Sequence, residues 1–352
     1  MYIIATANIS PQNTFEQNEV LKNIVEYNSN QLTCIEPDYK SFIDAKLIRR
    51  MSRIIKMGVT AATKCLQNAG VSQPDAIVTG TAYGCLEDTG LFLTKMVEYN
   101  EELLTPTAFI QSTHNTIGGQ IGLMLQCHNY NNAFVHRGFS FESALQDAIM
   151  LLQENEAQNV LVGAIDEITN TSHTILSRLG LYKQGNICNS NLFAKKSKGT
   201  IAGEGSSFFL LANEPTENNC AKLNALHTFY KPNNVSEIEG SINNFLIENA
   251  ILLKNIDLII VGKNGDATND DVYEELEKSI FKNNVTINYK HLCGEYPTAA
   301  AFALWLATDI VKEGKLPAVY LKNELSENPI KSILVYTNYQ NIHHTLLLIS
   351  AC

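Results

Sequence analysis

The chain has 352 residues, which is long enough for one large domain or two fused halves with a sizeable core. It carries 36 acidic and 26 basic side chains, for a formal net charge of −10. This balance argues against a nucleic-acid-binding protein, because such proteins need a basic face. A hydrophobic content of 45% and a mean hydropathy of −0.07 are typical of a globular protein in water.

The start of the chain and its cysteines bear on where the protein works. The first residues, MYIIATANIS, lack the basic segment and apolar stretch of a secretory signal, and no apolar run reaches membrane-spanning length. The eight cysteines are scattered without CxxC pairs, as is typical of reduced thiols. We therefore expect a cytoplasmic protein without membrane insertion, a metal site or a cofactor.

Strand and helix patterns alternate along the first part of the chain. The apolar run at 75–84 is typical of a buried strand, and 112–126 has apolar residues at helical spacing. Residues 140–155 form an amphipathic helical pattern, and 159–167 is a second buried-strand pattern. Residues 203–214 are typical of a turn followed by a strand.

The second part of the chain repeats this alternation. The polar segment 215–222 contains a proline and is the predicted join, so we expect halves at 1–214 and 223–352. The repeated alternation predicts an α/β fold with a mixed sheet flanked by helices in each half. In the second half we expect helices at 241–253, 270–281 and 297–314, the last beginning at Pro297 and stopping at Gly314, and strands at 257–266, 332–341 and 343–349.

One turn raises a question about chemistry. Residues 131–153 form a β-prone run, a turn and a helix, and a helix N-terminus with its free N–H groups is a common mount for a nucleophile. The turn has Gly138 where a reactive side chain would be expected. Ser140 is interpreted as the helix N-cap, with a nucleophile as the alternative. His136 and Arg137 are interpreted as a solvated or interface pair, with anion binding as the alternative.

Several motifs together resemble one known family over nearly the whole chain. They are TPTAFIQSTHNTIGGQIGLML (105–125), the strand–turn–helix at 133–153, AKKSKGTIAGEGSSFFLL (194–211), VGKNGDATND (261–270) and YKHLCGEYPTAAAFALW (289–305). In this order they resemble the β-ketoacyl synthases, the thiolase-fold condensing enzymes of fatty-acid and polyketide synthesis. The resemblance implies a five-layered α/β/α/β/α arrangement with two pseudo-repeated halves.

The resemblance also implies which side chains the reaction needs. The family uses a cysteine to take the acyl group from an acyl carrier protein, and two histidines to assist decarboxylation of malonyl and stabilise the enolate. These positions fall on Gly138, Asn264 and Glu295. Glycine carries no acyl group, asparagine supplies no positive charge, and glutamate repels a malonyl carboxylate. We therefore predict that the condensing site is lost.

Other family positions have a counterpart here. Lys290 and Gly294 match retained residues of the loop before the last long helix, and Tyr339 stands where a gating phenylalanine is usual. In the family, the loop about thirty residues before the nucleophile turn reaches across the dimer to the floor of the partner's acyl tunnel. Counting back from Gly138 gives Ala108 for this floor, flanked by Thr107 and Phe109.

Three functions follow as hypotheses. The first is a non-catalytic homologue that resembles the chain-length-factor subunits of type II polyketide, aryl-polyene or flexirubin-like pathways; it pairs with an active ketosynthase and meets acyl carrier protein indirectly. The second is a divergent condensing or acyl-transfer enzyme that uses Cys293 with Glu295, against the simpler interpretation of Cys293 as a small buried residue. The third is a homodimeric acyl-binding scaffold. His343 and His344 have no further ligands nearby in sequence, so metal binding is not expected.

Overall fold

The computed structural model describes residues 1–16, 21–102, 104–216, 221–320 and 329–352. Part of the expected join, residues 217–220 with Cys220, lies outside these ranges. Within them, no helix combines the length and apolar character needed to span a bilayer.

The first half supplies five strands. They are β1 (Tyr2–Ile9), β2 (Ala76–Gly80), β3 (Tyr130–Phe134), β4 (Asn159–Asp166) and β5 (Gly205–Ala212). Its helices are α1 (Ala45–Ile48), α2 (Arg53–Ala69), α3 (Leu86–Glu98), α4 (Pro106–Gln111), α5 (Thr116–Leu125), α6 (Ser140–Gln153) and α7 (Asn170–Arg178). Strands β2 and β5 are buried along their whole length, as the continuous apolar runs predict for a sheet covered on both faces.

The second half supplies five more strands. They are β6 (Ala221–Tyr230), β7 (Leu258–Val261), β8 (Thr286–Asn288), β9 (Ser332–Tyr339) and β10 (His343–Ser350). Its helices are α8 (Val235–Glu248), α9 (Ala267–Lys278), α10 (Lys290–Cys293) and α11 (Ala300–Glu313).

The strand order shows that the two halves share one topology. The ten strands run β3-β2-β4-β5-β1-β6-β10-β9-β7-β8, so each half has the same order when it is counted from its own first strand. The pairings also correspond: β2 is parallel to β3 and β4 as β7 is parallel to β8 and β9, and the remaining pairs are antiparallel. The predicted pseudo-repeat is confirmed.

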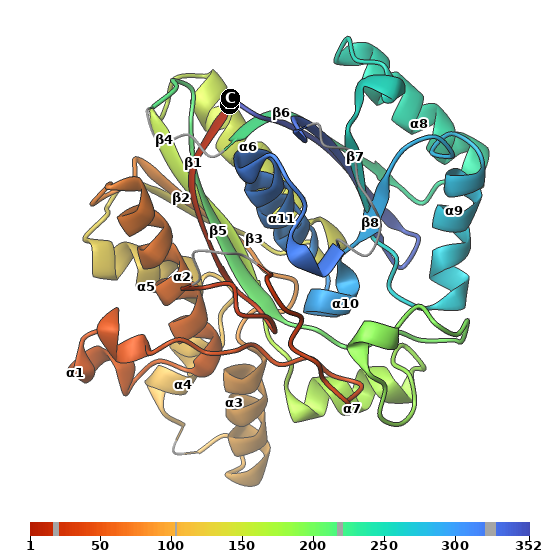
Figure 1. Cartoon of the computed structure of the whole chain (residues 1–352). Coiled ribbons are helices and arrows are strands. Elements are labelled where there is room, and N and C mark those ends of the chain that lie inside the picture. Colours follow the sequence, from red (N-terminus) through yellow and green to blue (C-terminus); the bar gives the residue numbers. More distant parts are fainter. Residues whose placement is uncertain (17–20, 103, 217–220, 321–328) are drawn as a thin grey trace.

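The two sheets that the sequence predicts are joined into one continuous hydrogen-bonded sheet. Among the described residues, Tyr2 and Ile3 of β1 pair with Lys222 and Ala221 of β6, so the connection there is short. Figure 1 shows the two halves splayed apart, with α6 and α11 between them. Helices α2 and α5 cover the outer face of the first half, and α8 and α9 cover that of the second. This is the predicted five-layered α/β/α/β/α fold.

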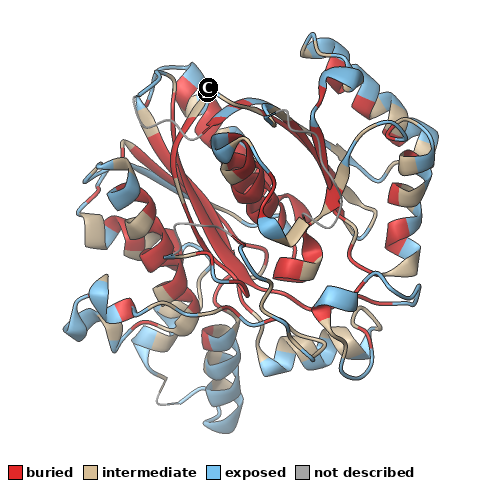
Figure 2. Ribbon diagram, in the orientation of Figure 1, coloured by how far each residue is buried: buried red, intermediate tan, exposed pale blue. Residues whose placement is uncertain are grey.

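The central layer holds the core that positions the site. Helix α11 is buried nearly all round, and its sequence AAFALWLATDIV is apolar on every face (Figure 2). It packs in one cluster with α6 and with the inner faces of both halves. The turns that precede α6 and α11 are therefore held rigidly at the same end of the molecule.

One expected helix start and one expected helix cap are wrong. Helix α11 begins at Ala300 and not at Pro297, because the Thr298 hydroxyl donates to the Asp166 carboxylate at 2.7 Å and holds this segment as a turn. Ser140 is not the N-cap of α6. Its hydroxyl donates to the Arg137 carbonyl at 2.9 Å and accepts the His136 N–H at 2.8 Å, so it closes the preceding turn.

Candidate functional site

Gly138 lies in the turn between β3 and α6, where a side chain would have almost no room. A Cβ atom built on Gly138 would lie 2.9 Å from both Cβ and Cγ of His343 and 2.9 Å from Cβ of Tyr339. Its φ is not positive, so close packing and not backbone conformation favours glycine here. The space that a side chain at position 138 would need is therefore filled by Tyr339 and His343.

The two side chains over Gly138 come from the β9–β10 hairpin. Tyr339 and His343 are directly opposite in the antiparallel register, and such a pair projects to the same face. The turn between them includes Gln340 at φ 57° and Asn341 at φ 52°, so it adopts left-handed backbone without the family's glycines.

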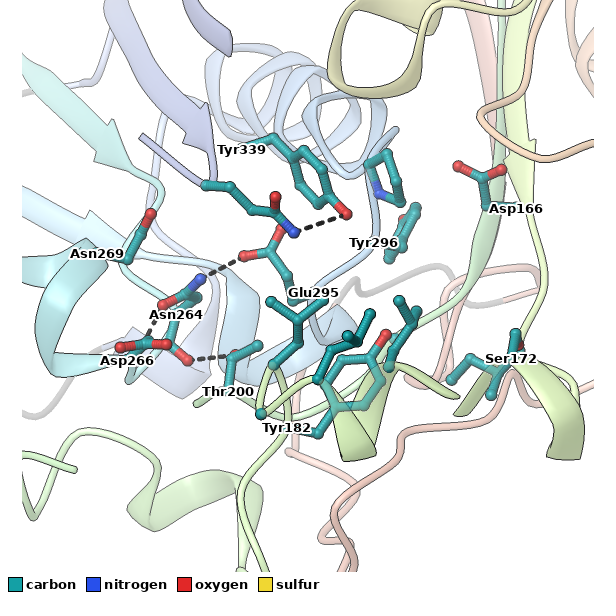
Figure 3. Close-up of a pocket in the computed structure, with 18 of the residues that line it drawn as sticks. Asp166, Ser172, Tyr182, Thr200, Asn264, Asp266, Asn269, Glu295, Tyr296 and Tyr339 are labelled. Atoms are coloured by element: carbon teal, nitrogen blue, oxygen red, sulfur yellow. Dashed lines mark hydrogen bonds between the residues drawn. The ribbon is translucent and has the colours of Figure 1, made fainter. Parts of the chain in front are cut away.

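A cleft of about 330 Å³ lies in front of this turn (Figure 3). Tyr339 and Glu295 line both this cleft and a much smaller cavity of about 10 Å³, and only the small cavity reaches Gly138. The Tyr339 hydroxyl lies 3.5 Å from that of Tyr83 and accepts a hydrogen bond from Gln340 at 3.3 Å. Tyr339 thus lies between the cleft and Gly138.

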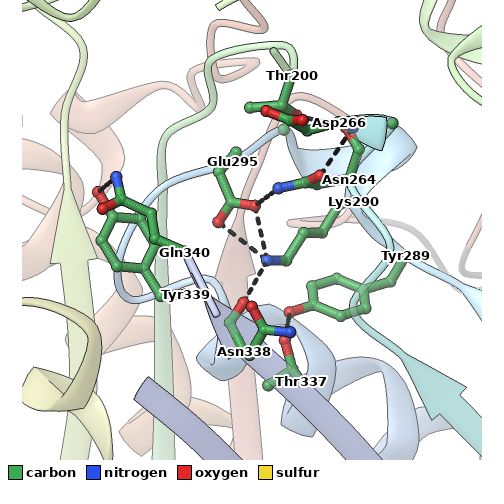
Figure 4. A network of polar contacts seen from close by, with 12 residues as sticks. Thr200, Asn264, Asp266, Tyr289, Lys290, Glu295, Thr337, Asn338, Tyr339 and Gln340 are labelled. Atoms are coloured by element: carbon green, nitrogen blue, oxygen red, sulfur yellow. Dashed lines mark hydrogen bonds and ion pairs between the residues drawn. The ribbon is translucent and has the colours of Figure 1, made fainter. Parts of the chain in front are cut away.

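Glu295 is held in a buried network with Lys290 and Asn264 (Figure 4). The Lys290 ammonium lies 2.9 Å from Oε1 and 2.7 Å from Oε2 of Glu295, and it also donates to the Asn338 carbonyl at 3.0 Å. Asn264 Nδ2 donates to Glu295 Oε2 at 2.6 Å. Lys290 is 2% exposed. Glu295 therefore neutralises a buried lysine instead of presenting a histidine-like donor to the cleft.

The loop of Asn264 fixes the orientation of its amide. Asp270 accepts the backbone N–H groups of Asn264 at 2.9 Å and Gly265 at 2.8 Å. The side-chain oxygen of Asn264 accepts the N–H of Asp266 at 3.0 Å, and the Thr200 hydroxyl donates to the Asn264 carbonyl at 2.5 Å. Since both polar atoms of the side chain are engaged, the amide is a fixed structural link.

Two glycines allow the loops of the site to touch. Gly294 has a φ of 76°, and a Cβ there would lie 2.5 Å from the Cα of Gly203. A Cβ on Gly203 would lie 2.1 Å from the Cys293 carbonyl oxygen. The contact places Glu295 beside the segment that precedes β5, where the backbone N–H of Glu295 donates to the Ile201 carbonyl at 2.8 Å. Glycine is thus favoured at position 294 of the turn because the two backbone segments approach each other so closely.

The cleft wall has more acidic than basic groups. Asp166, Glu167, Asp266 and Glu295 line it, with Lys198 as a cation. Burial raises the pKa of Asp166 to about 6, although hydrogen bonds from Thr298 and others oppose the shift. Burial also raises the pKa of Glu167 to about 7. Asp166 is 2% and Glu167 6% exposed, so the first-half wall of the cleft is poorly solvated, and this burial is the cause of both shifts.

The alternative nucleophiles, Cys293 and Ser140, are both buried. Cys293 is fully buried, its thiol contacts the Gly294 carbonyl at 3.3 Å, and burial raises its pKa well above the ordinary value. A buried thiol with a raised pKa is inert because the thiolate is the nucleophile. Ser140 is also fully buried. The side chains of His136 and Arg137 are exposed. His344 is a separate case, because burial lowers the pKa of its imidazole to about 4.

The expected tunnel residues lie away from this cleft. Thr107 and Phe109 are exposed on α4, and Ala108 is half-buried. The Phe109 ring packs against Phe92 of α3, with centroids 5.6 Å apart. None of the three lines the main cleft. If they shape a tunnel, it is not the cleft in front of Gly138.

Some site residues were not foreseen from the sequence. Tyr83 follows β2 directly and Tyr182 lies in a loop after α7, and both line the cleft. Asp166 ends β4, and the carboxyl end of a strand is a usual place for site residues. His343 was considered only as a metal ligand, yet it covers Gly138.

Comparison with known proteins identifies part of the chain. Residues 25–180 match the family model described as β-ketoacyl synthase, N-terminal domain. This segment is similar to that domain. A search of curated protein sequences found no match.

Solved structures with the same fold match this chain over its whole length. The ishigamide ketosynthase/chain length factor matches with a TM-score of 0.81 and 15% identity, covering 100% of this chain and 98% of that one. The ketosynthase ApeO in complex with its chain length factor ApeC from Xenorhabdus doucetiae matches at 0.77 and 16%, covering 100% and 98%. AntDE:AntF, a type II acyl carrier protein in complex with its ketosynthase bound to the hexaketide, matches at 0.78 and 13%, covering 100% and 99%.

Restoring the cysteine alone is expected to fail. In the variant Gly138→Cys, Tyr339 and His343 crowd the new side chain, and Asn264 and Glu295 still provide no cationic donor pair. We expect no carbon–carbon bond formation from malonyl- and acyl-carrier protein. We also expect the introduced thiol to react with iodoacetamide more slowly than the exposed Cys352, measured by intact mass. Condensation by this single variant would contradict the prediction.

Proposed function

We propose that this chain is a non-catalytic ketosynthase homologue that pairs, like a chain length factor, with an active β-ketoacyl synthase and shapes its acyl tunnel in polyketide- or fatty-acid-type chain elongation. The observation that carries the proposal is the closed nucleophile position. Gly138 offers no nucleophile, and Tyr339 and His343 occupy the space in which one would stand.

The charge arrangement supports the same proposal. Condensation needs groups that stabilise a developing enolate, and the position of the second histidine carries Glu295 bound to Lys290. A carboxylate there opposes both a malonyl carboxylate and an enolate. The chain therefore has the fold of the family, but Glu295 at the position of the second histidine binds Lys290 and offers no enolate-stabilising donor.

The surface around β3 supports pairing with a second subunit. Strand β3 ends the strand order and leaves its outer backbone groups open to another strand. Large apolar side chains are exposed close by in sequence, including Ile110, Leu123, Tyr130 and Val135. An open edge beside exposed apolar side chains is typical of an interface.

A mass measurement tests the loss of catalysis. The purified chain is incubated with acyl- and malonyl-carrier protein, and we expect no covalent adduct by intact mass. An adduct that disappears in Cys293→Ala would overturn the proposal in favour of the divergent enzyme. Co-expression with a neighbouring cysteine-bearing ketosynthase tests the partner, and a chain that remains a partnerless homodimer would favour the acyl-binding scaffold.

Dimerisation through residues 105–137 is a separate prediction. We expect Ile110→Asp to weaken the dimer at least tenfold, because it places a charge within an apolar interface. Ile247→Asp on α8 is the matched control, since Ile247 is 74% exposed and Ile110 is 57% exposed. Analytical ultracentrifugation at micromolar concentration measures both. A monomeric parent chain, or equal effects of the two variants, would place the interface elsewhere.

The length of the product tests the proposed tunnel floor. In the co-expressed complex, Ala108→Phe is expected to shorten the products, because an added ring fills space that several chain carbons need. The half-buried and surface position of Ala108 suits a contact with the partner's tunnel. Products are sized by mass spectrometry, and Ala108→Ser is the control that leaves their length unchanged. An unchanged length distribution in an intact Ala108→Phe complex would place the floor elsewhere.

A further inference from the structure

The ring of His343 holds the tip of the β9–β10 hairpin over Gly138. This ring meets Phe139 edge-on with 4.7 Å between the ring centroids, and it meets Tyr230 of β6 at 5.4 Å. In the antiparallel registers, His343 pairs with Tyr230 on one side and with Tyr339 on the other. One half-buried imidazole therefore joins the hairpin to β6 and to the turn before α6.

Groups that are positive at acid pH surround this imidazole. The ring centroids of His136 and His343 are 6.4 Å apart, and His136 and Arg137 directly precede Gly138. Phe139 is the N-cap residue of α6, so the positive end of the helix dipole also faces the imidazole that packs on it. An imidazolium at position 343 would thus meet like charge from the turn and from α6.

The nearby carboxyl groups do not offset this repulsion. Glu142, Glu295 and the Lys290 ammonium line the same small cavity as His343. Glu295 is neutralised by Lys290, at 2.9 and 2.7 Å. Burial raises the pKa of Glu142 to about 7, so this carboxyl group is largely neutral at the pH at which a histidine becomes protonated. The other titratable groups against the ring are two phenols, which carry no charge at acid pH: Tyr230 and Tyr339.

The closed hairpin therefore favours the neutral form of His343. Burial lowers the pKa of its imidazole, the charges of His136 and Arg137 add to this shift, and the Tyr339 backbone opposes it. The closed form holds this pKa below the ordinary histidine value of about 6.5. The preference for the closed form is consequently complete above that pH and is lost as the pH falls below it.

The turn beneath the hairpin has a strained backbone. Arg137 has a φ of 47°, in the left-handed region. This region is unfavourable for a residue with a long side chain, and such a conformation persists where the surrounding contacts fix it. The contact of His343 with Phe139 is one that holds this turn in place. Separation of the hairpin from the turn would therefore let Arg137 relax.

We propose that His343 is a pH-sensitive latch, in which the neutral imidazole holds the hairpin tip (339–343) over Gly138 and the imidazolium releases it. Tyr339 moves with the tip, because it pairs with His343 in the hairpin. Since Tyr339 lies between the main cleft and Gly138, acidification joins the cleft to the space around this glycine. The latch does not depend on the proposed pairing with a ketosynthase.

Amide hydrogen exchange of the full chain measures the opening. Mass spectrometry follows peptides that cover 337–345 at pH 7.5 and pH 5.5, and each rate is divided by that of the unstructured peptide at the same pH. We expect protection of this segment to fall about three- to tenfold at pH 5.5, because an ordinary histidine pKa limits the effect to about tenfold over this range. Peptides of the buried strand β2 report global unfolding and should keep their protection. Equal protection of the hairpin at both pH values, or a parallel loss in β2, would overturn the proposal.

Variants assign the response to one imidazole. His343→Phe keeps an aromatic ring against Phe139 and Tyr230 but cannot be protonated, so we expect hairpin protection that does not change with pH. His343→Gln covers the case in which the phenylalanine variant misfolds; its hairpin should be less protected at both pH values, again without pH dependence. His128→Gln, at an exposed histidine before β3, is the matched control and should respond like the parent chain. A parent-like response in a folded His343 variant, or a lost response in His128→Gln, would refute the latch.

Discussion

Glu295→Leu is expected to lower the free energy of unfolding by about 3–5 kcal/mol, measured by urea denaturation. Among the described residues, the Asn338 carbonyl is the acceptor that the substitution leaves to the buried Lys290 ammonium. Removing one partner of a buried ion pair leaves an uncompensated charge, whose burial is costly. Asn264 also loses the acceptor of its amide group, which adds to the loss.

The double variant Lys290→Met with Glu295→Leu is the matched control. Replacing both members of a buried pair by apolar side chains of similar volume is often nearly neutral. We therefore expect the double variant to recover most of the stability that Glu295→Leu loses. A loss below about 1 kcal/mol in Glu295→Leu would show that Lys290 does not depend on this carboxylate.

Arg53→Met should destabilise the chain by a similar amount, about 3–5 kcal/mol. Arg53 begins α2, and its two terminal nitrogens contact both carboxylate oxygens of Glu204, at 2.7 and 2.5 Å. Glu204 is fully buried and also accepts the N–H groups of Cys34 at 2.7 Å and Ile168 at 2.9 Å. This one carboxylate therefore holds three separate segments against β5.

Arg53→Lys and Arg53→Met with Glu204→Gln separate the contributions. Lysine keeps the charge but loses the two-point contact, so we expect an intermediate loss. The double variant removes the buried charge, although the single amide oxygen of glutamine can accept only one of the two backbone N–H groups, and it should be more stable than Arg53→Met alone. Equal stability of Arg53→Met and the parent chain would mean that the two backbone donors suffice for Glu204.

Resemblance and periodicity together predicted the fold correctly. The alternation of strand and helix patterns in each half corresponds to the repeated strand order, because burial on both faces requires continuous apolar runs. Helix ends were less predictable. Pro297 satisfies the local rule for a helix start, but the bond between Thr298 and Asp166 joins residues 132 positions apart, and this contact keeps the segment as a turn.

The sequence by itself led to the prediction that Gly138, Asn264 and Glu295 stand at the family's catalytic positions, because residue identity in an ordered motif is a local property. Only the tertiary structure decided which side chains surround these three residues. Tyr339 and His343 lie about two hundred residues after Gly138, and the register of the β9–β10 hairpin brings them over it. The contact of Asn264 with Glu295, and that of Glu142 with Thr345, likewise depend on packing between distant elements, which no local pattern encodes.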